Sequence, residues 1–296
     1  MANTDDIKKI LAQHFHAPIT KIEEINAGNI NKIFSFSHDE KYYILRLNKN
    51  KTAFQKAGTL SKILTGGGVP FAKIHHIGEH EEDAYSISQK IAGNPIGNVM
   101  STEKLAISII KNTQKIHQTP LVSTLGYGFL ADNGDGIYSN WNDFIDAFFS
   151  EVGIGTFWTG WYELFETSCL ERDVFDEIFA RLKKYSQYNA PYRHLVHGDL
   201  HGLNILAQGD EVTGIIDFDN VMYGDFLIDI ATIDLVVEAK KFEAHYKKIG
   251  MPIENFNERY LGAKYFKGLD NLRFYAKMGN VASYESLRDY LLDLEG

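Results

Sequence analysis

The sequence predicts an α+β fold in which a small antiparallel sheet precedes a larger, mostly helical part. Short runs of strand-like residues dominate up to about residue 90, and from Gly93 onward apolar residues recur at spacings of three and four. A third observation is the stretch 194–219, where two short apolar runs interrupt the helical pattern. With 296 residues, the chain is long enough for one large domain or for two lobes that share a core.

The composition is that of a globular protein, with 44% hydrophobic and 23% charged residues. Thirty Lys and Arg residues against 39 Asp and Glu give a net charge of −9, which argues against nonspecific nucleic-acid binding. Cys169 is the only cysteine, which excludes an intrachain disulfide and a zinc site with several cysteines. Neither a secretory signal nor a membrane-spanning run is recognisable, so we expect a cytoplasmic monomer without membrane or nucleic-acid partners.

The first part is predicted as a helix followed by an antiparallel meander. Thr4 precedes apolar residues at helical spacing as far as Phe15, which is typical of a capped amphipathic helix. A second helix is expected over 52–64, because the three glycines at 66–68 favour its end there. The runs with strand-like composition are residues 21–27, 32–37, 42–47, 73–78 and 84–89, with polar turn residues at 38–41.

The second part is predicted as helices around a small β element. In that element, two apolar runs flank a tight turn at 208–210. We expect the boundary near residue 90, giving lobes 1–90 and 91–296, and a hinge between them because no low-complexity linker is present. The segments with helical periodicity are 104–117, 141–152, 172–188, 226–249 and 257–279, and the two apolar runs are 205–207 and 212–216.

The most informative stretch is residues 194–220, HLVHGDLHGLNILAQGDEVTGIIDFDN. Asn204 follows Asp199 by five positions, and Asp217 follows Asn204 by thirteen, directly after an apolar strand. A hairpin between them would bring the three oxygen-bearing side chains together. Phosphoryl transfer needs this set: a carboxylate that accepts the proton of the attacking hydroxyl, and oxygen ligands that hold Mg²⁺ against the phosphates. Each residue alone is more often a turn residue, but the joint pattern favours a site.

This stretch resembles the catalytic-loop motif of the aminoglycoside phosphotransferases and the related choline and homoserine kinases. The run Tyr43–Arg46 is similar to the family's strand that bears a phosphate-contacting cation, and the resemblance covers nearly the whole chain. It implies the bilobal fold of protein kinases, with Mg²⁺ and ATP or GTP as cofactors. By the same resemblance Asp199 is the catalytic base, Asn204 and Asp217 are metal ligands, and Arg46 is the phosphate anchor.

Further runs most resemble the hygromycin B phosphotransferase subgroup of that family. They are residues 193–206, the pairing of 222–225 with 228–231, and 126–128 followed by 141–145. This similarity implies a hydroxyl-bearing, cationic acceptor, with an aminoglycoside or aminocyclitol first among the candidates.

The nucleotide is expected between the sheet and the small β element. A lone glycine at position 28 is weak by itself, but its place ahead of Arg46 is similar to the family's nucleotide loop. Main-chain N–H groups would then meet phosphates, branched side chains would enclose the base, and main chain at 88–91 would read the purine edge. Each aliphatic residue alone is more often core. The expected contacts are Gly28, Asn29, Ile30, Asn31, Ile33, Ile44, Arg46, Ser88, Lys90, Ile91, Leu206 and Ile216.

One departure from the family pattern concerns the partner of Arg46. No acidic residue occurs from Lys41 through Gly78, so the Glu that usually orients this cation from the following helix is missing. Gln55 is the nearest polar substitute, since an amide can hold a guanidinium without neutralising it. The alternative is that the cation sits loosely or is oriented from elsewhere.

The acceptor side is expected to combine aromatic planes with carboxylates, which suit a polycationic, hydroxyl-rich ligand. The segment 141–166 holds several Trp and acidic residues, and further acids follow Asp217. The alternative is that the aromatic residues pack in the core, and that the later acids cap and support a helix. The candidate residues are Trp158, Trp161, Glu163, Asp219, Asp225 and Asp229.

The sequence therefore predicts a Mg²⁺-dependent phosphotransferase that acts on a hydroxyl of a small cationic molecule. A metabolic kinase for choline, homoserine or methylthioribose is the alternative within this class. A nucleotide-binding pseudokinase is a second alternative, because the helix Glu is missing. A protein kinase is disfavoured, because no Ala-Pro-Glu segment follows Asp217.

Overall fold

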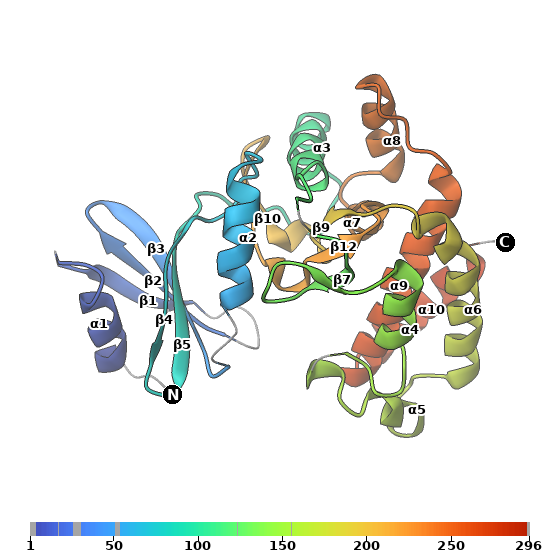
Figure 1. Cartoon of the computed structure of the whole chain (residues 1–296), viewed down its shortest axis with the longest axis horizontal. Coiled ribbons are helices and arrows are strands. Elements are labelled where there is room, and N and C mark those ends of the chain that lie inside the picture. The colour runs from blue at the N-terminus through green and yellow to red at the C-terminus, as the bar shows by residue number, and fades with distance from the viewer. Residues whose placement is uncertain are drawn as a thin grey trace.

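The computed structural model describes residues 4–16, 18–25, 31–50, 54–122, 124–154 and 156–294. An N-terminal sheet with two helices stands beside a larger helical part that contains two small sheets (Figure 1). Among the described helices, none has the length and the apolar character needed to cross a membrane.

The N-terminal sheet is the predicted antiparallel meander. Its strands lie in the order β1-β2-β3-β5-β4, and every neighbouring pair is antiparallel. Asp39 and Glu40 both have positive φ, 48° and 61°, as expected for a two-residue hairpin turn between right-handed strands. The elements are α1 (Thr4–Ala12), β1 (Thr20–Ile25), β2 (Lys32–His38), β3 (Lys41–Asn48), α2 (Gln55–Thr65), β4 (Ile74–His80) and β5 (Asp83–Gln89).

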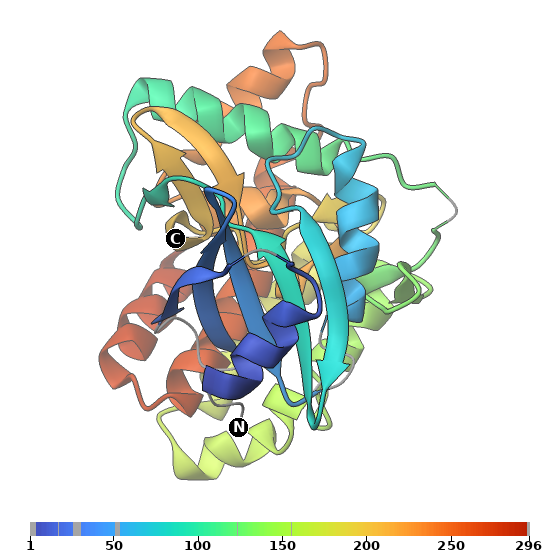
Figure 2. The same cartoon turned by 90° about the vertical axis from the view of Figure 1, so that its left-hand side faces the viewer.

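Side-chain alternation gives this sheet two different faces. Tyr43, Leu45 and Leu47 of β3 are buried in one cluster with apolar residues of α1, which covers this face (Figure 2). The residues between them, Ile44 and Arg46, therefore point to the opposite face. The sequence thus places the predicted phosphate anchor on the face that α1 does not cover.

The C-terminal part begins with β6 (Asn94–Pro95) and α3 (Glu103–His117). It contains two small sheets with strand orders β11-β10-β6 and β8-β7-β12-β9. Its remaining elements are β7 (Tyr127–Leu130), β8 (Gly136–Tyr138), α4 (Trp141–Phe148), α5 (Leu164–Thr167), α6 (Arg172–Asn189), β9 (His194–Val196), β10 (Ile205–Gln208), β11 (Glu211–Ile215), β12 (Met222–Gly224), α7 (Leu227–Ile233), α8 (Ala239–Lys248), α9 (Phe256–Lys277) and α10 (Val281–Asp293).

One predicted helix is wrong: the segment 226–249 forms two helices, α7 and α8. The backbone N–H of Ala239 donates to the carboxylate of Asp234 at 2.8 Å, which starts a new helix in a new direction. Val236 and Val237 are buried in the break, and their apolar character had made the pattern look continuous. The helix predicted over 141–152 also ends earlier, at Phe148.

Buried apolar residues form two core clusters. One joins α1 to the N-terminal sheet, and the other extends through the helical part. Leu60 and Leu64 of α2 belong to the second cluster, and α2 lies between the sheet and the helical part in Figure 1. A helix of the predicted N-terminal lobe therefore packs into the core of the helical part, and packing alone does not divide the chain at residue 90. The lobe boundary at residue 90 stays a prediction.

Candidate active site

The segment 197–199 follows β9 and is fixed by one buried carboxylate. Asp229, with no exposed surface, accepts hydrogen bonds from the backbone N–H of His197 at 2.8 Å and of Gly198 at 2.9 Å. Gly198 has a φ of 80°, and a Cβ at this position would collide with the carbonyl oxygen of Asn220. The loop conformation therefore depends both on a glycine and on a helix residue 31 positions further along the chain.

The ring of His197 is buried and neutral. Its Nε2 donates to the carbonyl oxygen of Ile216 at 2.9 Å, and its Nδ1 accepts from the backbone N–H of Asp199 at 3.2 Å. Burial lowers the pKa of His197, which keeps this tautomer uncharged. The ring thus connects the segment before Asp199 to the strand before Asp217.

Asp199 is partly accessible to solvent, with 33% of its side chain exposed. One carboxylate oxygen is 3.6 Å from Nε2 of His201, and the other is 3.9 Å from the ammonium of Lys267. Burial by itself would raise the pKa of Asp199, but the contact with His201 and the charge of Lys267 hold it below its ordinary value. Asp199 is therefore ionised at neutral pH and able to accept a proton.

Asn204 is hydrogen-bonded to the backbone of Asp199 and to the backbone of Ile216, which precedes Asp217. Its side-chain nitrogen donates to the carbonyl oxygen of Asp199 at 2.9 Å, so its side-chain oxygen is the atom that remains for a metal ion. Its own carbonyl accepts from the backbone N–H of Ile216 at 3.0 Å, directly before Asp217. The hairpin of β10 and β11 thus brings Asp199, Asn204 and Asp217 together.

Asp217 has the features of a carboxylate built to bind a cation. Its backbone is left-handed, with φ 63° and ψ 61°, a strained conformation for a residue other than glycine. Partial burial and the charges of Asp219 and Asp199 raise its pKa, and Arg46 and His197 act in the opposite direction. The carboxylate of Asp217 and the amide oxygen of Asn204 are donors of the kind that Mg²⁺ prefers, so these two residues fit that ion.

Arg46 finds an acidic partner that the sequence had not suggested. Its guanidinium lies 3.6 Å from the carboxylate of Asp219 and 5.7 Å from the centre of the Phe54 ring. The side chain of Lys56 on α2 donates to the backbone carbonyl of Asp219 at 2.7 Å. Gln55 is exposed on α2. The cation is therefore oriented from the segment after Asp217, which was the alternative to an orienting residue on the helix.

The sheet face that carries Arg46 also carries three of the predicted contacts to the base, Ile33, Ile44 and Ser88. Arg46 lies opposite Ile33, and Ile44 lies opposite Ser88 in the adjacent strands. In the helical part, Leu206 of β10 is 9% exposed, and Ile216 follows β11. These residues remain predicted nucleotide contacts, and the register places Ile33, Ile44, Arg46 and Ser88 on one surface.

Other predicted nucleotide contacts have different positions. Gly28, Asn29 and Ile30 lie outside the described residues, and the side chain of Asn31 accepts from that of Asn48 at 2.7 Å. The backbone N–H of Lys90 donates to the carbonyl oxygen of Tyr42 at 2.9 Å. That main chain at 88–91 reads a purine edge stays a prediction, for which the other main-chain groups of this segment remain. The side chain of Ile91 packs against Gly214 of β11. A Cβ atom at position 214 would collide with it.

Two of the acids predicted at the acceptor site are buried structural groups. Asp225 has no exposed surface and forms two hydrogen bonds of 2.8 Å with the guanidinium of Arg259. Asp229 also has no exposed surface and holds the segment before Asp199. A side chain without exposed surface does not contact a ligand, so these two acceptor predictions are wrong.

The two tryptophans predicted at the acceptor site are also buried. Trp161 is 1% and Trp158 is 7% exposed, and their rings lie 4.7 Å and 4.2 Å from the guanidinium of Arg273. Both rings pack against the guanidinium of Arg273, so the prediction that they stack on an acceptor is wrong. Glu163 is exposed and stays a predicted acceptor contact, whereas exposed Asp219 faces Arg46.

Sequence reasoning missed Lys267, which donates to the carbonyl of Gly198 at 2.8 Å. The available signal was a lysine between apolar residues of a helix, on the same face as Ala263 and Asp270. A charged residue among the buried positions of a helix indicates a buried partner.

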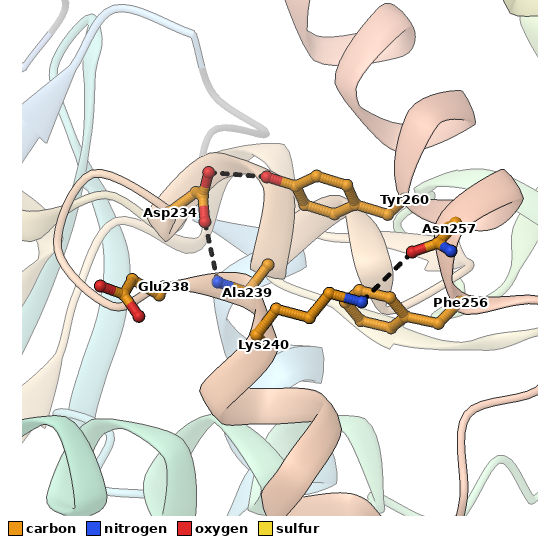
Figure 3. Close-up of a pocket in the computed structure, with 7 residues that line it drawn as sticks. All are labelled: Asp234, Glu238, Ala239, Lys240, Phe256, Asn257 and Tyr260. Atoms are coloured by element: carbon orange, nitrogen blue, oxygen red, sulfur yellow. Dashed lines mark hydrogen bonds between the residues drawn. The ribbon is translucent and has the colours of Figure 1, made fainter. Parts of the chain in front are cut away.

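A pocket elsewhere in the helical part contains none of the predicted site residues (Figure 3). There Asp234 accepts hydrogen bonds from the hydroxyl of Tyr260 at 2.6 Å and from the N–H of Ala239, so its carboxylate stabilises the junction of α7 and α8. Its lining residues are Asp234, Glu238, Ala239, Lys240, Phe256, Asn257 and Tyr260.

The sequence was compared with protein families and with characterised proteins. A family model described as "Phosphotransferase enzyme family" matches residues 21–233. Hygromycin-B 4-O-kinase of Escherichia coli is 25% identical over 230 residues, which are 77% of this chain and 65% of that protein. The chain thus spans less than two thirds of the length of this curated relative.

Solved structures with the same fold include aminoglycoside phosphotransferase APH(4)-Ia, with a TM-score of 0.81 at 20% identity over 99% of this chain and 100% of that chain. A thermostable mutant of the same enzyme, in a ternary complex with AMP-PNP and hygromycin B, gives a TM-score of 0.79 at 21% identity, over 98% and 97% of the two chains. Spectinomycin phosphotransferase APH(9)-Ia, in complex with ADP and spectinomycin, gives 0.68 at 13% identity and covers 99% of both chains. The predicted bilobal, protein-kinase-like fold is confirmed.

Proposed function

Because the chain belongs to the phosphotransferase enzyme family, we propose that it transfers the γ-phosphate of ATP or GTP to a hydroxyl group of a small cationic molecule. The observation that carries this proposal is the meeting of Asp199, Asn204 and Asp217 at one hairpin, with the Arg46 cation paired to Asp219 beside them. A base, two oxygen ligands and a cation are the parts that phosphoryl transfer uses.

Each residue then has a defined task. Asp199, ionised at neutral pH, accepts the proton of the attacking hydroxyl. Asn204 and Asp217 would hold Mg²⁺, which when bound offsets the negative charge of the phosphates. Arg46 holds a phosphate oxygen with a charge that does not depend on pH. Positioning and charge compensation supply most of the rate.

We propose an aminoglycoside or aminocyclitol as the acceptor. The similar proteins support this, because they include a hygromycin-B 4-O-kinase and a phosphotransferase solved in complex with hygromycin B. Residues 101–296 contain 18 basic and 29 acidic residues, a net charge of −11, which favours a cationic ligand on this part of the chain. The pairing of Arg46 with Asp219 weakens the pseudokinase alternative, since the cation does not lack an acidic partner.

The test is an acceptor screen that follows ADP release with Mg²⁺ and ATP or GTP. We expect turnover with hygromycin B or another aminocyclitol, a product heavier by one phosphate, and increased resistance of a sensitive host that expresses the protein. Turnover only with choline, homoserine or methylthioribose would support the metabolic kinase instead. Binding of nucleotide without any transfer would support the pseudokinase.

Asp219→Asn is expected to raise the KM for nucleotide about two- to fivefold, because a partly exposed ion pair contributes less than about 1 kcal/mol. The side chains of Arg46 and Asp219 are 26% and 56% exposed, so solvent screens their attraction. The measurement is the KM for ATP at saturating acceptor, together with thermal unfolding, which should change little.

Asp173→Asn, at an exposed position on α6, is the matched control and should leave this KM unchanged. A lower KM in Asp219→Asn would show that the carboxylate competes with phosphate for Arg46, in contradiction to an orienting role.

A further inference from the structure

One face of α9 carries a row of buried charges that leads toward the catalytic loop. Lys267, Asp270 and Arg273 are spaced three residues apart, so they follow one another along the helix. Lys267 is 9% exposed and Arg273 has no exposed surface. Buried charges destabilise a fold unless each has partners, so the partners of this row show what it supports.

At one end of the row, Lys267 contacts the catalytic loop. Its ammonium donates to the carbonyl oxygen of Gly198 at 2.8 Å and lies 3.9 Å from one carboxylate oxygen of Asp199. The second carboxylate oxygen of Asp199 is 3.6 Å from His201. The carboxylate is thus held between two groups on opposite oxygens, and the peptide before it is held by the same lysine.

At the other end, Arg273 is anchored in the core. Its guanidinium donates to the carbonyl of Phe148 and to the carboxylate of Asp270, both at 3.0 Å, and it packs against the rings of Trp158 and Trp161. Asp270 also lies 4.0 Å from Lys267 and so joins the two cations. The position of Lys267 is therefore set by an anchored neighbour and not by its own flexible side chain.

A second lysine of the same helix has similar contacts but a different target. Lys264 donates to the carbonyl of Ala231 at 3.1 Å and lies 3.2 Å from the carboxylate of Asp234. Asp234 lines the pocket in Figure 3, away from the residues assigned to catalysis. Lys264 and Lys267 thus lie on the same helix, and each contacts a backbone carbonyl and an aspartate. Only Lys267 contacts the catalytic loop.

We propose that Lys267 is a positioning residue for the catalytic base: its ammonium fixes the Gly198–Asp199 peptide and the orientation of the Asp199 carboxylate. This inference rests on the proposed function, in which Asp199 accepts the hydroxyl proton. At 3.9 Å the attraction acts through charge and not through a hydrogen bond, so the carboxylate remains free to receive that proton.

Small displacements of a catalytic group have large effects on rate. A shift of about 1 Å lowers rates by about 100-fold in well-oriented sites. Lys267→Met keeps an unbranched apolar stem and removes the ammonium group, and with it both the charge and the hydrogen bond to Gly198. We therefore expect kcat to fall by about 10- to 100-fold, with the KM for ATP changed less than about threefold, because Arg46, Asn204 and Asp217 are untouched.

The experiment measures kcat and both KM values for wild type, Lys267→Met and Lys264→Met, with the acceptor found in the screen. Lys264→Met also loses a partly buried lysine–aspartate pair, so it should lose similar thermal stability and keep the kcat of the wild type. Asp270→Asn, which removes the charge between Lys267 and Arg273, is expected to lower kcat with the same unchanged KM for ATP. It serves as the second variant if Lys267→Met does not fold.

Three results would overturn the inference. The first is an unchanged kcat in folded Lys267→Met or, where that variant does not fold, in Asp270→Asn. The second is an equal loss of kcat in Lys264→Met, which would show only a general effect of destabilising α9. The third is a raised acceptor KM at constant kcat, which would make Lys267 a binding residue. Absence of turnover in the wild type would remove the proposed function and this inference together, and is recognised before any variant is measured.

Discussion

Asp199→Asn is expected to lower kcat for acceptor phosphorylation by about 10²- to 10⁴-fold, the usual contribution of a general base. Asparagine has the same shape but does not accept the hydroxyl proton. The hydrogen bond from Asn204 goes to the backbone carbonyl of residue 199, so the substitution leaves that contact in place. Nucleotide affinity should therefore change little. The measurements are ADP release at saturating acceptor and ATP, and nucleotide binding by thermal shift.

Asp199→Ala should be measured beside it, because deamidation of asparagine would restore some aspartate. Asp173→Asn on α6 serves as the exposed control and should keep the activity of the wild type. If Asp199→Ala phosphorylates the acceptor at the rate of the wild type, Asp199 is not the base. The proposed mechanism would then lose its central residue, although the fold and the family would stand.

Asp225→Ala is expected to reduce the free energy of unfolding by about 3–5 kcal/mol, because it leaves a buried guanidinium without its counter-charge. Arg259 is 1% exposed, and both of its hydrogen bonds to Asp225 are 2.8 Å long. Asp225 also accepts from the side chain of Asn189 at 2.8 Å and from the backbone of Leu227 at 3.0 Å. Urea unfolding followed by fluorescence measures the loss.

Asp219→Ala is the matched control, since it breaks an Asp–Arg pair of which the aspartate is 56% exposed and should lose less than about 1 kcal/mol. The double variant Asp225→Leu with Arg259→Met should be more stable than Asp225→Ala, because it removes both buried charges. A stable Asp225→Ala with a raised KM for the acceptor would restore the view that Asp225 binds the acceptor, and would contradict the structural role.

The parts of the fold that follow from local rules could be predicted from the sequence. Alternation and turn residues gave the strands of the N-terminal sheet, and the run before Asp217 gave the hairpin of β10 and β11. The break between α7 and α8 could not be read from the pattern. Val236 and Val237 continue the apolar periodicity there, and the pattern does not show that the carboxylate of Asp234 accepts a hydrogen bond from the backbone N–H of Ala239, the first residue of α8.

Some residues of the candidate site could likewise be predicted from the sequence, and others could not. Asp199, Asn204 and Asp217 could be grouped from their spacing, because a short hairpin leaves few ways to arrange its ends. For the acids after Asp217, the sequence left open a role in binding the acceptor and, for Asp225 and Asp229, a role in supporting a helix. In the structure Asp219 is exposed beside Arg46, while Asp225 is buried against Arg259. Sequence shows which side chains carry charge, but not which of them face solvent.

By itself, the sequence predicted the strands of the N-terminal sheet, the hairpin of β10 and β11, the grouping of the three oxygen-bearing residues of the candidate site and the cation on β3. These depend on contacts within one hairpin or on the alternation of one strand, whose geometry is fixed. Only the tertiary structure decided which charges are paired and buried. Arg259 reaches Asp225 across 34 residues, and Lys267 reaches Gly198 across 69. Attraction and desolvation depend on distance and exposure in space, which spacing along a chain does not record.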